Sequence, residues 1–124
     1  MALPSSRTFN TVDLTAYTPS VGASPVAAYI RVPTRGRILK FSGILGGAIT
    51  TADGTITITN ATQGTTVGTF TVTQAASAAG LLFPGSPSTS AVAQVNEDDV
   101  VVFTPSGASG ASIPMHFSAT IRAN

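Results

Sequence analysis

The fold is decided by the stretch Ile113-Pro114-Met115-His116-Phe117-Ser118-Ala119-Thr120-Ile121-Arg122. Its odd-numbered residues are all apolar, whereas its even-numbered residues are a proline followed by four polar side chains. Successive side chains of a β-strand point to opposite faces, so this period of two predicts a strand with one buried face and one solvated face. The stretch is the clearest strand signal in the chain and indicates a β protein.

Five further segments carry strand signals. Two of them are threonine-rich and alternating, and the stretch 60–66 between them, which contains Gly64, predicts a hairpin with a moderately long loop. Another segment is apolar on both faces, which predicts a central strand that is buried on both sides. The five segments span residues 26–32, 37–45, 55–59, 67–73 and 100–103.

Helix signals are nearly absent. Residues 74–83 contain four alanines, but Gly80 and Pro84 favour a loop with at most one helical turn, and 84–90 is the longest loop-like segment. Seven or eight short strands with a turn about every ten residues predict an all-β fold, an antiparallel, jelly-roll-like β-sandwich. We expect one sandwich domain over residues 26–124, preceded by residues 1–25 as an extended N-terminal arm or an edge strand.

The composition argues against an enzyme. Ala, Gly, Ser and Thr make up 62 of the 124 residues, charged residues are 9%, and the chain has one His, no Cys and no Trp. Such a chain has few side chains from which to build a catalytic site, and no phosphate-binding or nucleophile motif occurs in it. We therefore expect no cofactor, no metal and no catalysis, and a function that depends on surface shape.

Two places in the chain carry side chains that could serve metal or acid–base chemistry. His116 has the one side chain with an ordinary pKa near neutrality, but its position on the polar face of the last strand favours a surface or subunit contact. Glu97-Asp98-Asp99 could offer oxygen ligands to Ca²⁺, but their spacing does not match a calcium loop. A solvated turn in front of a buried strand is the favoured interpretation.

Four of the six cations lie within ten residues: Arg31, Arg35, Arg37 and Lys40. Nucleic-acid binders carry a much larger basic excess than the net charge of +1 found here, together with exposed aromatic rings. We expect these cations to meet carboxylates of a neighbouring subunit instead, because the arginine fork orients as well as attracts. The N-terminus lacks the pattern of a signal peptide and no apolar run is long enough to span a membrane, so synthesis in the cytoplasm is expected.

Several motifs within residues 26–122 form a recognisable set: Val32-Pro33-Thr34-Arg35-Gly36-Arg37-Ile38, Gly46-Gly47-Ala48-Ile49-Thr50-Thr51-Ala52-Asp53, Ser77-Ala78-Ala79-Gly80, Asn96-Glu97-Asp98-Asp99-Val100 and the closing strand. Together they resemble the small β-sandwich decoration, or cement, proteins and related head-fibre modules of tailed bacteriophages. The resemblance implies a non-enzymatic virion protein on the outer capsid surface, made in the host cytoplasm. It also implies a homotrimer that binds and bridges major capsid protein subunits, with neither nucleic acid nor membrane as a partner.

The N-terminal segment is the expected capsid contact, with Arg7 and Phe9 on an arm that lies across a neighbouring subunit. The alternative is a carbohydrate or host-receptor-binding module of a head or tail fibre on the same sandwich. That function needs aromatic platforms, and the chain has two Tyr and no Trp, which weighs against it. A third class, a small enzyme or metal protein, would require His116 and the acidic turn to converge.

Overall fold

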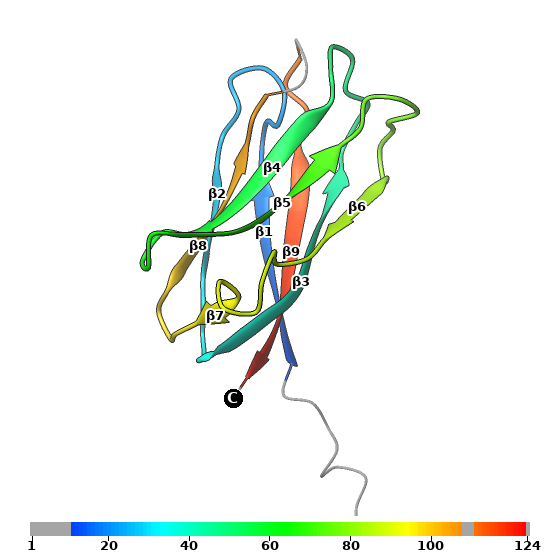
Figure 1. Cartoon of the computed structure of the whole chain (residues 1–124). Helices are drawn as coiled ribbons and strands as arrows, with labels where there is room; N and C mark the ends of the chain where they lie inside the picture. Colours follow the sequence, from blue (N-terminus) through cyan, green and yellow to red (C-terminus); the bar gives the residue numbers. More distant parts are fainter. Residues whose placement is uncertain (1–10, 108–110, 124) are drawn as a thin grey trace, which may run out of the picture.

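The computed structural model describes residues 11–107 and 111–123, and within them the chain forms nine strands and no helix. The strands make two antiparallel sheets that pack face to face (Figure 1). The predicted all-β antiparallel sandwich is confirmed. The strands are β1 (Thr11–Thr18), β2 (Ala28–Arg31), β3 (Gly36–Leu45), β4 (Gly54–Asn60), β5 (Thr65–Val72), β6 (Leu82–Gly85), β7 (Gln94–Val95), β8 (Val100–Pro105) and β9 (Met115–Ala123).

Sheet A has the strand order β1-β9-β3-β6, and β7 also pairs with β3. Sheet B has the order β2-β8-β4-β5. The segment that is apolar on both faces, β8, is an interior strand of sheet B, as its composition predicts, and Val101, Val102 and Phe103 are all buried in it. The described residues contain no helix of the length and apolarity that a membrane span requires.

Residues 11–18, within the segment for which an arm or an edge strand was expected, form the edge strand β1. It pairs with β9 without a register shift, from Thr11 opposite Arg122 to Thr18 opposite Met115. Arg7 and Phe9 lie outside the described residues.

Aromatic rings from both sheets fill the core. Phe117 of sheet A stacks on Phe103 of sheet B, with ring centroids 4.8 Å apart and planes 14° apart. Phe70 of sheet B lies 6.0 Å from Phe41 and 6.5 Å from Phe117. These rings are at most 5% exposed, so the inward face of β9 packs as its alternation predicts.

A β-bulge in β3 changes which of its side chains share a face. Ile38 pairs with Ile121 and Lys40 with Thr120, so Leu39 is an extra residue on β3. Ile38 and Phe41 are both 2% exposed although they are three residues apart, which a regular strand does not allow. As a consequence, residues 37 and 40 both lie on the outer face of the sheet.

The loop prediction for residues 84–90 is wrong at its start. Pro84 and Gly85 belong to β6, where Pro84 pairs with Ser42 and Gly85 with Phe41. Proline cannot donate a ladder hydrogen bond and is therefore tolerated in a strand at the edge of a sheet, which is where β6 lies. The four residues of β6 are too few and too rich in turn formers to give a strand signal of their own.

Candidate functional site

The outer face of sheet A is the candidate site. Its side chains lie in rows that run across the strands, because residues opposite each other in an antiparallel pair share a face. Three rows are defined by the register of β1, β9, β3 and β6. They are the apolar row (Tyr17, His116, Ile44 and Leu82), the hydroxyl row (Thr15, Ser118, Ser42 and Pro84) and a charged row (Asp13, Thr120 and Lys40).

The apolar row crosses the whole sheet at the end where β9 begins. Tyr17 is 52% exposed, Ile44 44% and Leu82 53%. The Tyr17 ring leans on the His116 ring, with centroids 4.9 Å apart. Large side chains that are half exposed and contiguous indicate a contact surface more strongly than single exposed ones.

A shallow hollow of about 350 Å³ lies over the hydroxyl and charged rows. The Ser42 and Ser118 hydroxyls are 2.8 Å apart and hydrogen bonded to each other. Thr120 donates a 2.6 Å hydrogen bond from its Oγ1 to Asp13. The hollow thus presents hydroxyl groups and one carboxylate, and Lys40 also lines it.

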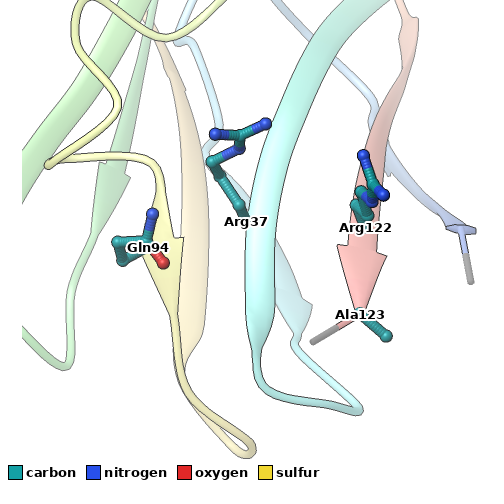
Figure 2. Close-up of a pocket in the computed structure, with 4 residues that line it drawn as sticks. All are labelled: Arg37, Gln94, Arg122 and Ala123. Carbon is teal, nitrogen blue, oxygen red and sulfur yellow. The ribbon is translucent and has the colours of Figure 1, made fainter.

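The opposite end of the face is basic. Arg37 on β3 lies directly opposite Arg122 on β9, and Gln94 on β7 is opposite Arg37 on its other side. Together with Ala123 they line a hollow of about 420 Å³ (Figure 2). Figure 2 shows Arg37 between Gln94 and Arg122, each on its own strand.

The structure divides the predicted group of four cations. Arg37 and Lys40 lie on the outer face of sheet A, whereas Arg31 is on β2 of sheet B, where its Nε donates a 2.7 Å hydrogen bond to the Asp98 carboxylate. Arg35 is exposed in the turn between β2 and β3. That these four cations contact a neighbouring subunit stays a prediction.

Sequence reasoning missed Arg122, Tyr17, Ile44 and Leu82 as members of this face. For Ile44 a signal existed, because it continues the outward series of Lys40 and Ser42 and is the apolar residue in it. Arg122 was placed on the outward face of the last strand, but its neighbours depend on strand pairing, which composition does not specify.

The acidic turn, Glu97-Asp98-Asp99, is structural, because one of its carboxylates is buried and hydrogen bonded. The Asp99 residue is 3% exposed, and its Oδ2 accepts hydrogen bonds from Asn60 Nδ2 (2.9 Å), Gln63 Nε2 (2.8 Å) and the Asn96 backbone N–H (2.9 Å). Burial raises the pKa of Asp99, but these three hydrogen bonds together leave the pKa below its ordinary value. Its carboxylate points inward, away from that of Asp98.

His116 and the acidic turn do not converge. His116 lies on the outer face of sheet A, whereas Asp99 is tied to the β4–β5 loop. In the part of the chain that the structure describes, no three His, Asp or Glu side chains gather as metal ligands would.

The outer face of sheet B has a different character. Threonines face each other across its strands, as in the pairs Thr57 with Thr69 and Thr55 with Thr71. Threonine suits a half-solvated pleated surface. Tyr29 is 68% exposed on this face, but no row of exposed apolar residues crosses it among the described residues.

No family model matches the chain, and no curated protein matches it. Among solved structures, a carbohydrate-binding module of Clostridium stercorarium, CsCBM6-3 in complex with cellobiose, is similar over 93% of this chain and 82% of its own, with 13% identity and a TM-score of 0.51. The cyanophage Pam1 capsid asymmetric unit contains a chain that is similar over 94% of this chain and 89% of its own, with 16% identity and a TM-score of 0.51. At 13% and 16% identity these similarities show a shared β-sandwich fold and nothing more specific.

Proposed function

We propose that this chain is a non-catalytic structural protein of a phage virion that attaches to the outer capsid surface and stabilises the capsid by bridging major capsid subunits. The observation that carries the proposal is the apolar row, in which three half-exposed large side chains and His116 cross one sheet face. Exposed apolar surface of this kind is typical of protein interfaces. The similar fold within the cyanophage capsid structure supports the same assignment.

The size of the face favours attachment through several contacts, as in bridging, and not through a single contact. Strands about 4.8 Å apart and rows about 7 Å apart give the outer face of sheet A an area of roughly 500 Å². A stable protein complex buries about 800 Å² on each partner, so one such face binds weakly by itself. Attachment through several linked contacts, as in a trimer on a repeating lattice, raises the overall affinity without enlarging any one contact.

The test uses purified chain and capsids that lack it. Addition of the chain should raise the capsid melting temperature, because a ligand that binds the assembled state stabilises it by mass action. Ile44→Glu places a charge in the apolar row and should abolish both attachment and the shift. Thr69→Glu adds the same charge to the outer face of sheet B and serves as the matched control.

The proposal fails if the wild-type chain does not raise the melting temperature. The assignment of the outer face of sheet A as the docking face is wrong if Ile44→Glu attaches to capsids as well as the Thr69→Glu control does. Native mass measurement of the free chain tests the trimer separately.

A carbohydrate-binding function is the second candidate, and one observation favours it. Tyr17 carries a half-exposed ring in the row next to a hollow that is lined by hydroxyl groups and the Asp13 carboxylate, and rings and hydroxyl groups together suit sugar faces and sugar hydroxyls. A structurally similar module was solved with cellobiose. NMR titration with cellobiose should shift the resonances of Tyr17 and Ser118 if this candidate is correct. Copy number separates the two, since a structural protein is present in hundreds of copies per particle and a fibre module in far fewer.

A further inference from the structure

The edge strands of the two sheets differ in how they are protected from pairing with another chain. β2 and β6 have four residues each and β7 has two, and Pro84 lies in β6. β5 is longer, but its edge is covered where the Ser88 N–H donates a 2.9 Å hydrogen bond to the Val67 carbonyl. Short strands, prolines and covering loops are the devices by which proteins keep edge strands from pairing.

β1, the remaining edge strand, carries none of these devices. It is eight residues long, contains neither Pro nor Gly, and pairs with β9 without a bulge. Asp13 is its one charged residue, so little charge repulsion opposes a second strand beside it. On the side away from β9, no strand of the described residues pairs with it. β1 is therefore the edge of the sandwich that is open to another strand.

The direction of the backbone groups of β1 follows from the neighbouring ladder. The Gly46 N–H donates a 2.8 Å hydrogen bond to the Pro114 carbonyl, so the even-numbered residues along β9 direct their backbone groups toward β3. The odd-numbered residues of β9 then bond to β1, and the register places even-numbered residues of β1 opposite them. The N–H and C=O groups of the odd-numbered residues, from Thr11 to Tyr17, thus point away from the sheet.

The inward side chains of β1 are incompletely covered. Val12, Leu14 and Ala16 are half-buried, whereas the β9 residues opposite them are buried. A further strand beside β1 would remove more of their apolar surface from water. Pairing at this edge therefore gains apolar burial as well as hydrogen bonds.

We propose that β1 pairs antiparallel with β1 of a second copy of this chain, across a two-fold axis at Leu14. In this register Thr11 lies opposite Tyr17 of the second copy. Asp13 likewise lies opposite Thr15 of the second copy. All four residues direct their backbone groups outward, so each such pair exchanges two hydrogen bonds.

Charge and strand length select this register. A two-fold axis at Asp13 would set two carboxylates opposite each other, which destabilises a strand pair. An axis at Thr15 would place Thr11 opposite Pro19, beyond the end of β1. The axis at Leu14 uses the whole outward edge and sets each carboxylate opposite a hydroxyl group. The edge is thus complementary to itself, as a contact between identical patches requires.

Pairing at β1 joins two outer faces of sheet A into one. Opposite residues share a face of the sheet, so both apolar rows lie on the same side of the joined sheet. The joined face has an area of roughly 1,000 Å², which exceeds the area of about 800 Å² that each partner buries in a stable complex. Use of this face for capsid attachment rests on the proposed function, whereas the pairing itself does not. A two-fold contact is compatible with the proposed trimer, because it can join two trimers as well as two single chains.

The first test is sedimentation of the isolated chain from about 10 μM to about 1 mM, which covers the affinities of weak contacts. Wild type should form species with an even number of copies. Thr15→Pro removes an outward N–H on each copy and leaves the β1–β9 ladder intact, so the dissociation constant should rise about thirtyfold. Thr15→Val keeps the N–H and the side-chain size and should stay within about twofold of wild type.

Two results of this test overturn the proposal. One is a wild-type chain that stays a monomer, or forms a trimer alone, over the whole concentration range. The other is association of Thr15→Pro as tight as that of Thr15→Val. A thermal melt of both variants checks the fold, and the cysteine test below does not depend on whether Thr15→Pro folds.

Single cysteines test the register, because the chain itself contains no Cys. Leu14→Cys puts a thiol on the two-fold axis, where opposite Cα atoms lie about 4.5 Å apart, within the range of a disulfide. Val12→Cys is the matched control on the same half-buried face, but its own copy lies about 14 Å away in this register. With copper phenanthroline as the oxidant, Leu14→Cys should form disulfide-linked pairs and Val12→Cys should not. Equal cross-linking of the two variants, or none, overturns the pairing.

The capsid assay separates this inference from the proposed function. If the wild-type chain pairs through β1 but does not attach to capsids, the edge contact stands and the capsid assignment falls. If it attaches to capsids but neither sediments as an even-numbered species nor cross-links at residue 14, the edge contact falls and the capsid assignment stands.

Discussion

Replacement of Asp99 by alanine is expected to destabilise the sandwich strongly. Its Oδ2 accepts three hydrogen bonds, and those from Asn60 and Gln63 join the turn before β8 to the β4–β5 hairpin. Asn60, one of the donors, is 0% exposed, so its amide cannot turn to water when the carboxylate is removed. A buried donor without a partner costs about 1–3 kcal/mol.

The other two donors belong to exposed residues, Gln63 and Asn96, which water can reach. Their share of the loss is about 1 kcal/mol in total, because solvent replaces most of each hydrogen bond. The free energy of unfolding should therefore fall by about 3 kcal/mol in Asp99→Ala. Asp99→Asn keeps an acceptor oxygen without the charge and should lose about half as much, since charge-assisted hydrogen bonds are roughly twice as strong as neutral ones.

The assay is urea denaturation, and the control is the neighbouring carboxylate. The Asp98 ion pair with Arg31 is exposed on both sides, so Asp98→Asn should cost at most about 1 kcal/mol. Asparagine is chosen there because Asp98 has a φ of +70°, which asparagine tolerates and alanine does not. A slope of about 1.5 kcal/mol/M gives a midpoint shift of about 2 M for Asp99→Ala. A loss no greater than that of Asp98→Asn would refute the reasoning.

Three further outcomes are expected. The difference in unfolding free energy between wild type and Asp99→Ala should shrink as the pH falls below about 4. The folded-state pKa of Asp99 is depressed, so its carboxylate stabilises the fold above the unfolded-state pKa, and that stabilisation is lost as the pH drops through the folded-state pKa. Urea titrations at pH 7 and pH 3 measure the difference. Phe117→Ala should cost about 3–5 kcal/mol in urea unfolding, since Phe117 is 1% exposed and stacks on Phe103, and a cost below about 2 kcal/mol would contradict the packing. Gly85→Ala should cost about 1–3 kcal/mol, because an added Cβ would lie 2.5 Å from Phe41 Cε1; a neutral result would place Gly85 in a loop, as the sequence indicates, and not in β6.

Much of the fold could be predicted because it depends on local patterns. The alternation of residues 113–122 specifies which side chains of β9 enter the core, and Met115, Phe117, Ala119 and Ile121 do so. The run at 100–103 specifies an interior strand for the same reason. β6 and β7 could not be predicted, because Leu82–Gly85 and Gln94–Val95 are strands by virtue of their pairing with β3 and carry no period of their own.

The candidate site could be predicted only in part. Arg37 and Lys40 were selected by their closeness in sequence, and both lie on the candidate face. Arg31 was selected by the same criterion but lies on the other sheet, because the turn at 33–35 carries the chain from sheet B to sheet A. Closeness along the chain does not decide which sheet a residue joins.

By itself the sequence determined that this protein is an antiparallel sandwich of short strands, poor in charge and in reactive side chains, because period-two patterning and composition are properties of the chain alone. Tertiary structure alone decided what its surface presents. The bulge at Leu39 turns residues 37 and 40 to the same side, and pairing of β3 with β9 sets Arg37 beside Arg122, 85 positions later in the chain. The apolar row likewise exists because four strands distant in sequence align in register, and register is fixed by the packing of both sheets around a shared core.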